Sequence, residues 1–193
     1  MCGVILSFWL FLFKQGVANE RRISVADGEM RHGRKSKSKR IDGYKRHVAK
    51  DMDSHAVIAC VATPANRPEC EAVPVLKSDI EKQGIRVGET HIDRGCIASA
   101  AISELETTGS LILCKPWKNS DGELYSKEDF NINLKTQKGR QQFRERVSVE
   151  HPLAHIGQRQ GKKVRYLGTR KNTFELRRAA AIQNLEIAQR NAA

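Results

Sequence analysis

The chain has 193 residues, which is enough for one domain with a hydrophobic core. Its formal net charge is +12 and its pI is about 9.7, which disfavours an enzyme of small molecules and favours a polyanionic partner such as DNA, RNA or an anionic membrane face. The five cysteines form no C-x-x-C pair, so neither a disulfide framework nor a zinc ribbon is indicated, and reduced thiols in a cytoplasmic protein are expected.

The N-terminal stretch differs from the rest of the chain, because residues 4–13 read VILSFWLFLF, ten apolar or small residues in a row. A membrane-spanning helix needs about 20 such residues. A signal peptide has its basic residues ahead of the apolar run, whereas Lys14 follows it. A buried strand, a short hydrophobic helix and a stretch foreign to the domain are the three alternatives. Of these, we expect residues 1–23 to be foreign or out of register.

The next part of the chain predicts a basic loop followed by a β-hairpin. Residues 31–40 hold six Lys or Arg, a density typical of a solvated loop or arm. Residues 44–50 alternate in polarity, residues 51–54 read as a turn, and residues 55–63 are apolar and β-branched. This pattern predicts two antiparallel strands, the second more buried than the first.

Helical and strand patterns alternate over the middle of the chain. Residues 69–83 predict a helix that kinks or restarts at Pro74 and ends at Gly84. Strands are expected at 85–93 and 110–117, the latter buried, with a short helix between them that ends at Gly109. A hairpin followed by this βαβ pattern predicts an α/β layer with a mixed sheet.

Residues 117–139 are polar and read as a loop, and two helices are expected after them. In the first, over residues 140–157, the helical repeat places four side chains on one face: Phe143, Val147, Glu150 and Ala154. Residues 161–171 form a basic connector. The last helix is expected to open with a capping box at Asn172 and Glu175 and to bury Phe174, Ala181, Leu185 and Ala188.

Two carboxylates in this layout suit a metal ion. Asp93 follows a strand, at the sheet end where α/β proteins bind ligands, and Glu150 lies on a helix face that should pack towards the sheet. Paired carboxylates can hold Mg²⁺, and two-metal phosphodiester chemistry usually needs a third. Without further support, an ordinary turn aspartate is the simpler explanation of Asp93.

Four stretches in this order resemble the DDE transposases of bacterial insertion sequences: GYKRHVAKDMDS at 43–54, TPANRPE at 63–69, HIDRG at 91–95 and RERVSVEH onward at 144–186. The resemblance runs from about residue 24 to 190. It implies a ribonuclease-H-like fold in which two aspartates and a glutamate bind two Mg²⁺ (or Mn²⁺) ions for DNA cleavage and strand transfer.

By this resemblance Asp93 matches the second aspartate of the triad and Glu150 the glutamate. Phe143, Arg146 and Glu150 fill the family frame Tyr-x-x-Arg-x-x-x-Glu, which implies that Arg146 contacts the DNA backbone. An ion pair of Arg146 with Glu150 is the structural alternative. Further phosphate contacts are expected from the two basic segments: Arg34, Lys35, Lys37, Lys39, Arg40, Lys162, Lys163, Arg165, Arg170 and Lys171.

The chain departs from the family pattern at its first aspartate and in its length. That aspartate belongs on a strand before the hairpin, where residues 4–13 carry no acid, and Asp27 is the nearest substitute. Asp93 and Glu150 are only 57 positions apart, which predicts a shortened insertion at 117–139.

Two further departures concern single residues. Pro152 would cost roughly 3 kcal/mol in a helix interior, so the helix is expected to kink or restart there and re-aim Glu150. Cys96 replaces the tyrosine that is usual after the second aspartate.

Other interpretations rest on fewer residues. The spacing of His151 and His155, together with His91 and Asp93, allows a zinc site, with surface histidines as the simpler alternative. The basic run 31–40 could be a localisation signal or a heparin-like patch. The last helix could bind a partner instead of its own sheet.

The sequence therefore predicts an α/β chain, a partial ribonuclease-H-like mixed sheet with flanking helices over residues 24–193. We expect a truncated and internally deleted transposase with little or no activity. A non-catalytic DNA-binding remnant and a small basic RNA-associated protein are the alternatives. The expected partners are insertion-sequence ends and target DNA at the bacterial nucleoid in the cytoplasm. No membrane is expected, and a homodimer is left open.

Overall fold

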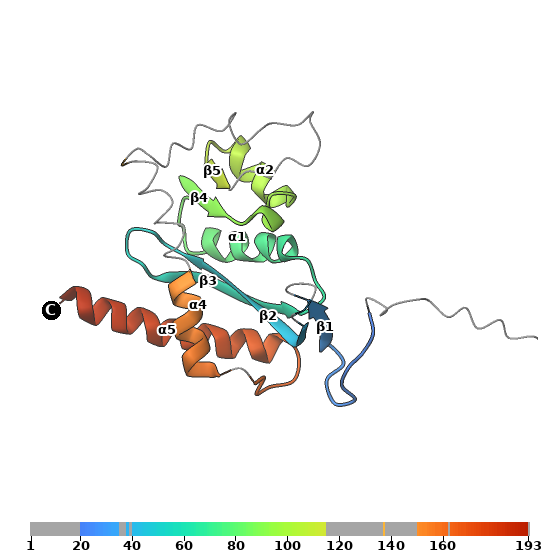
Figure 1. The fold of residues 1–193 in the computed structure, drawn as a ribbon. Helices are drawn as coiled ribbons and strands as arrows, with labels where there is room; N and C mark the ends of the chain where they lie inside the picture. Colours follow the sequence, from blue (N-terminus) through green and yellow to red (C-terminus); the bar gives the residue numbers. More distant parts are fainter. Residues whose placement is uncertain are drawn as a thin grey trace, which may run out of the picture.

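The computed structural model describes residues 20–34, 38, 40–114, 137, 150–161 and 163–192. Within these ranges the chain forms two small sheets with helices around them, in the predicted mixed α/β class and consistent with a partial ribonuclease-H-like fold (Figure 1). Three strands form the first sheet and two strands form the second. No helix in these ranges is long and apolar enough to cross a membrane.

The predicted hairpin forms the centre of the first sheet. β2 (Arg40–Lys50) pairs antiparallel with β3 (Val57–Pro64). The turn between them is closed by Asp51, whose carboxylate accepts hydrogen bonds from the backbone N–H and the hydroxyl of Ser54. The second strand is the more buried of the two, as predicted, because four of its side chains are buried: Val57, Ala59, Cys60 and Ala62.

The basic segment 31–40 begins as a strand, where a loop was predicted. β1 (Arg31–Arg34) pairs antiparallel with the first residues of β2. Gly33 passes so close to the chain after β3 that a Cβ atom there would lie 2.0 Å from the carbonyl oxygen of Ala65. Only glycine fits this crossing, which fixes β1 against the hairpin.

The second sheet is the predicted βαβ unit, with a helical connection ahead of it. A 3₁₀ turn at Glu69–Ala72 leads into α1 (Val73–Glu81), and Pro74 is the second residue of α1, where its missing N–H is tolerated. The predicted restart at Pro74 therefore lies close to the observed start. Gly84 follows α1 with a positive φ of 72°, which favours glycine.

The two strands of this sheet are short and parallel. β4 (Glu89–Ile92) and β5 (Leu111–Cys114) flank α2 (Ala100–Thr107). The prediction that the last strand is buried is wrong at Leu111, whose side chain faces solvent and which is 53% exposed.

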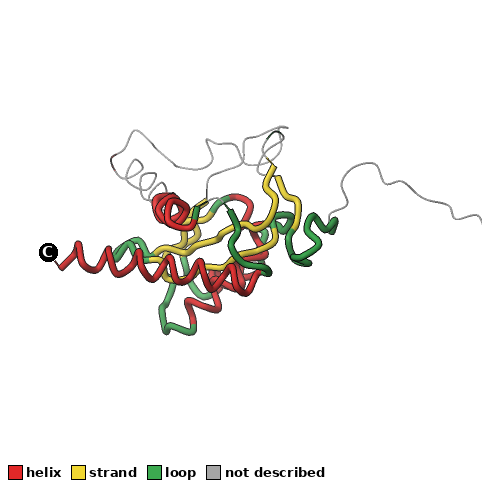
Figure 2. The backbone as a smooth tube through the Cα atoms, turned by 90° about the horizontal axis from the view of Figure 1, so that it is seen from below, coloured by secondary structure: helices red, strands yellow, loops and turns green. Residues whose placement is uncertain are grey.

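The remaining helices pack on the hairpin. α4 (Glu150–Gln160) runs without a break through Pro152, its third residue, a position early in the described helix where proline is tolerated. α5 (Thr169–Ala192) is the long helix that lies along the strands in Figure 2. Buried side chains from α4, α5 and β3 form one core cluster: Val57, Cys60, Ile156, Leu176, Ala179 and Ala180.

The prediction for the last helix is wrong in two respects. α5 begins at Thr169, so Asn172 lies inside it and donates its side-chain amide to the carbonyl of Gly168 instead of capping. The predicted buried face is exposed, with Phe174 69% and Leu185 71% accessible, while Leu176 is 1% accessible. The small side chains Ala179 and Ala180 and the buried Gln183 give the core-facing side little apolar contrast in the sequence.

The loop before β1 is fastened to the start of α5. Asp27 is buried, and its carboxylate accepts hydrogen bonds from the Tyr44 hydroxyl at 2.6 Å and from the backbone N–H of Gly168 at 3.1 Å. Glu29 accepts the backbone N–H of Thr169 at 2.8 Å. Both acids thus satisfy orphan donors at a helix N-terminus, where negative charge is favourable.

Candidate functional site

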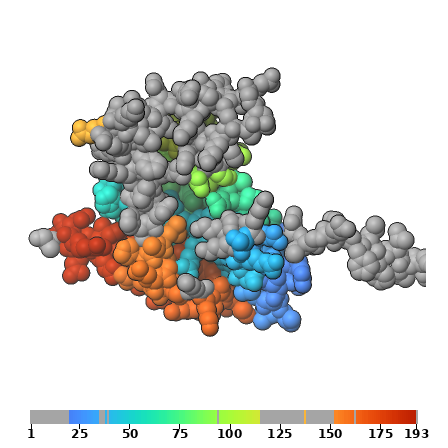
Figure 3. Space-filling model, viewed as in Figure 1, coloured from blue at the N-terminus to red at the C-terminus, as the bar shows by residue number. Residues whose placement is uncertain are grey.

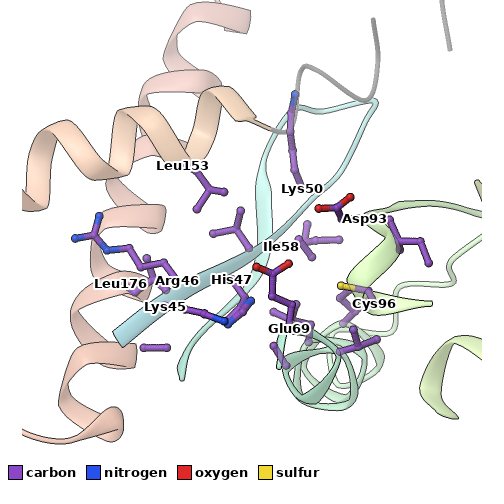
Figure 4. A pocket seen from close by; sticks show the side chains of 18 of the residues that line it. Lys45, Arg46, His47, Lys50, Ile58, Glu69, Asp93, Cys96, Leu153 and Leu176 are labelled. Atoms are coloured by element: carbon purple, nitrogen blue, oxygen red, sulfur yellow. The ribbon is translucent and has the colours of Figure 1, made fainter. Parts of the chain in front are cut away.

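A cavity of about 2150 Å³ lies between the hairpin and the second sheet (Figure 4). Every residue of β2 (Arg40–Lys50) except Gly43 lines it on one side, and residues 86–93, which include β4, line it on the other. Apolar side chains from the surrounding helices close it, among them Leu76, Ile80, Leu153 and Leu176. In the space-filling view α4, in orange, and α5, in red, form one continuous surface beside the β1 region, in blue (Figure 3).

Asp93 lies where the sequence placed it, directly after β4, and lines this cavity. Its backbone carbonyl accepts the N–H of Cys96 at 2.9 Å, which closes the short 3₁₀ turn Arg94–Cys96. In Figure 4 its carboxylate points across the cavity in the direction of β2. The turn presents Asp93 at the strand end, so the strand-end position expected for a ligand-binding acid is observed.

A second acid, which the sequence did not single out, shares this end of the cavity. Glu69 begins the 3₁₀ turn before α1, and Figure 4 shows its carboxylate pointing into the cavity near Cys96. Burial raises the pKa of the Cys96 thiol, and the negative charges of Glu69 and Asp93 act in the same direction, so that together they bring the pKa to about 11. The thiol is therefore neutral at physiological pH, and this end of the cavity is negative.

The opposite wall is cationic, and the sequence-based prediction treated it only as a strand. Lys45, Arg46, His47 and Lys50 follow one another along β2 and line the cavity. The Lys45 ammonium donates to the Arg67 carbonyl at 2.9 Å, and the Arg46 guanidinium donates to the Gly161 carbonyl at 2.8 Å. The run of cations within the alternating stretch 44–50 was the available signal.

Burial acts on the ionisation of these groups. Burial, and to a smaller extent the charge of Lys45, lower the pKa of the His47 imidazole to about 4, so His47 is neutral at pH 7. Its Nε2 is 2.8 Å from the hydroxyl of Thr63. Burial also lowers the pKa of Lys50, partly offset by the carboxylate of Asp51. The positive charge of this wall therefore comes from its lysines and arginine.

The two acids expected to pair cannot be compared in space. Glu150 is the first residue of α4, and its side chain lies outside the described part, as does Arg146. Asp27, the substitute for the missing first aspartate, is absent from the cavity lining and forms the cap on α5. The pairing of Asp93 with Glu150 stays a prediction.

The predicted phosphate-binding residues fall in several places. Arg34 and Arg40 stand at the end of β1 and the start of β2, and Lys163 and Arg165 join them in the cavity lining. Arg170 and Lys171 lie in the first turn of α5. The remaining four lie outside the described residues: Lys35, Lys37, Lys39 and Lys162.

The described side chains do not supply a metal site. Among them, no group of three His, Cys, Asp or Glu is arranged to hold a metal ion. His91 has its Nε2 2.7 Å from the Glu89 carboxylate, within the same strand. Neither the two-metal arrangement nor the zinc alternative finds a ligand set in these ranges.

The comparisons with known proteins gave one result. A family model described as "Transposase DDE domain" matches residues 18–185. No curated protein and no solved structure matches the chain.

Proposed function

Because the chain belongs to the transposase DDE domain family, we propose that it is a DNA-binding form of this transposition domain that lacks a working metal centre. The family associates the chain with DNA transposition and recombination, and its members generally use a divalent metal. In this proposal the chain retains a surface that binds DNA and has lost the ability to cleave it.

One observation carries the proposal: each acid ahead of β2 is used in a structural contact. The sequence up to residue 41 contains three acids, Glu20, Asp27 and Glu29. Glu20 pairs with Arg31 at 3.3 Å and with Arg67 at 3.5 Å. Asp27 and Glu29 cap α5. A first metal ligand drawn from residues 1–41 would therefore have to be taken from contacts that hold the fold together.

The cationic wall supports the DNA-binding part of the proposal. Lysines and arginines of β2, with Lys163 and Arg165, face one cavity in a chain of net charge +12. Such side chains bind phosphates and release counterions, without reading the base sequence. A DNA partner implies that the chain acts at the nucleoid in the bacterial cytoplasm.

The test compares binding with cleavage on the same duplex. We expect fluorescence anisotropy to show binding to insertion-sequence end DNA that weakens steeply with salt, and gels to show no cleavage in Mg²⁺ or Mn²⁺. The double variant Lys163→Glu and Arg165→Glu should weaken binding and flatten its salt dependence, by roughly 0.9 in log–log slope per lost phosphate contact. Lys82→Glu, at a 74% exposed side chain outside the cavity, is the matched control.

Two outcomes would overturn the proposal. Metal-dependent cleavage that disappears in Asp93→Ala would show that a working centre survives. Binding that resists salt and ignores the Lys163 and Arg165 changes would show that DNA contact lies elsewhere, and equally tight binding to single-stranded RNA would favour the RNA-associated alternative.

A further inference from the structure

β1 is the middle segment of a narrow ribbon at the edge of the first sheet (Figure 1). On one side β1 pairs with the start of β2, and Arg34 lies directly opposite Arg40. On its other side an isolated antiparallel bridge joins Arg31 to Arg22. Successive side chains of a strand point to opposite faces, so this register decides which arginines of the ribbon share a face.

One face of the ribbon carries an arginine whose charge is offset locally. Arg31 pairs with Glu20 at 3.3 Å, and its guanidinium donates to the carbonyl of Gly28 at 2.7 Å. Its bridge partner Arg22 lies on the same face, since the Arg22 Cζ atom is 3.9 Å from the position that a Cβ atom on Gly28 would take. On this face an acid and a carbonyl of the ribbon itself therefore bind the Arg31 guanidinium.

The opposite face surrounds a cavity of about 210 Å³, which we call the arginine pocket. Its lining is Arg21, Ile23, His32, Arg34 and Arg40. The register accounts for this set, because positions 21 and 23 flank the bridged residue 22, and positions 32 and 34 lie one and three residues after the bridged residue 31. The same register adds one acid to this face, Asp42, whose carboxylate contacts Nδ1 of His32.

The arginine pocket concentrates positive charge without an acid for each guanidinium. Arg34 and Arg40 are directly opposite each other, and like charges in that position destabilise a pair of strands. Within the described part of the chain, neither of them nor Arg21 forms an ion pair or a side-chain hydrogen bond. An anion bound between the three guanidinium groups would offset this repulsion and would accept the hydrogen bonds that they can donate.

We propose that the arginine pocket binds a phosphate monoester dianion. A terminal phosphate carries close to two negative charges at pH 7 and has three free oxygens, whereas each phosphodiester of the DNA backbone carries one charge. Three guanidinium groups, each a planar fork of N–H donors, match the terminal phosphate in charge and in its number of acceptors. The cavity is also smaller than the pockets of about 300–1,000 Å³ that hold drug-sized ligands, which favours a small anion.

The end of a DNA strand and free phosphate are two sources of this anion. Arg34 and Arg40 line the large cavity as well as the arginine pocket. A strand end held in the arginine pocket would therefore continue directly onto the cationic wall of β2. As a site for strand ends the arginine pocket deepens the proposed DNA binding and rests on it, whereas as a site for free phosphate it is independent of that proposal.

The first experiment titrates inorganic phosphate into the full chain by calorimetry, with chloride at the same ionic strength as the blank. We expect saturable binding that Arg21→Ala weakens about tenfold, because a charge-assisted hydrogen bond is lost. Arg21→Lys keeps the charge but not the planar fork, so its affinity should lie between the two. Arg22→Ala is the matched control, since it removes the neighbouring arginine from the opposite face of the ribbon and should leave the affinity unchanged.

The second experiment separates the two sources by fluorescence anisotropy on duplexes that differ only in their ends. We expect a duplex with 5′-phosphate or 3′-phosphate ends to bind about tenfold more tightly than one with hydroxyl ends. Inorganic phosphate and Arg21→Ala should each remove this advantage, and Arg22→Ala should preserve it. Saturable binding of inorganic phosphate without any preference for phosphorylated ends would support the pocket with free phosphate as its ligand.

Two results would overturn the proposal. The first is no saturable binding of phosphate together with equal affinity for phosphorylated and hydroxyl ends. The second is phosphate binding that neither Arg21→Ala nor Arg34→Ala weakens, which would place the anion elsewhere. Both variants change exposed side chains, and circular dichroism checks that they fold. Retained binding of the hydroxyl-ended duplex distinguishes failure of the arginine pocket from failure of the proposed function.

Discussion

The Tyr44 hydroxyl donates a 2.6 Å hydrogen bond to the carboxylate of Asp27, and the same oxygen accepts the backbone N–H of Gly168. The other carboxylate oxygen accepts the N–H groups of Glu29 and Met30. Asp27 thus joins the loop before β1, the strand β2 and the start of α5. A residue considered as a metal ligand from its sequence position is instead a tie between three parts of the fold.

We expect Asp27→Asn to destabilise the chain by about 2–3 kcal/mol and Tyr44→Phe by about 1–2 kcal/mol, because both leave a buried hydrogen-bonded group without its partner. Equilibrium urea denaturation measures both, and the double variant should cost less than the sum, since the two residues share one bond. Tyr166→Phe, at an exposed tyrosine, is the control. Lost Mn²⁺ binding in Asp27→Asn at unchanged stability would contradict the structural role.

The loss of stability at low pH should depend on Asp27. Burial raises the pKa of its carboxyl, but the hydrogen bonds from Tyr44, Gly168, Glu29 and Met30 outweigh it and hold the pKa below the ordinary value. A carboxyl with a depressed folded-state pKa adds stability above its unfolded pKa and loses that contribution as the pH falls through the folded value. Denaturation midpoints should therefore drop below about pH 4 in the unchanged chain. The drop should be smaller in Asp27→Asn. If the denaturation midpoints of the two proteins fall equally steeply with pH, the prediction is wrong.

Two leucines of α5, one buried and one exposed, allow the orientation of this helix to be tested. Leu176 is 1% exposed and packs in the core cluster, so Leu176→Ala should destabilise the chain by about 2–5 kcal/mol. Leu185 is 71% exposed, and Leu185→Ala should change stability by no more than about 0.5 kcal/mol. Thermal and chemical denaturation measure both, and the reverse order would restore the face predicted from the sequence.

The side chain of Asn184 should stabilise the chain by covering the edge of β3. Asn184→Ala removes the partner of the Val57 N–H and C=O groups, at a cost of about 1–3 kcal/mol, and leaves the strand edge open. Deuterium exchange at Val57 and light scattering during unfolding should both increase. Gln189→Ala, at an exposed position further along α5, should change neither measurement.

The hairpin, the βαβ unit and the fold class could be predicted from the sequence, because alternation, glycine stops and β-branched runs act locally. The face of α5 could not, since Ala179, Ala180 and the buried Glu175 and Gln183 give weak contrast along the helix. The buried Glu175 forms an ion pair with Arg178 at 2.7 Å, which the capping-box pattern did not indicate.

The candidate site was also predicted only in part from the sequence. Asp93 was found because it follows a strand. The cap formed by Asp27 was missed because its partner is 141 residues away, and the cations of β2 were missed because the cavity that collects them exists only in three dimensions. The predicted pairing of Asp93 with Glu150 is untested by the described side chains.

The tie between Asp27 and Gly168 also sets the order in which the chain can fold during synthesis. Gly168 lies 141 positions after Asp27, so at about 5–20 residues per second it is synthesised roughly 7–28 s later. The apolar face of the hairpin and the edge of β3 are both covered by α5 in the folded chain. Both therefore stay exposed to solvent until α5 has been synthesised. Contacts of such high sequence separation also slow folding itself. The nascent chain is therefore exposed to chaperones and proteases for most of its synthesis. The amount of protein in the cell should depend on how often this incomplete sheet is degraded before α5 covers it.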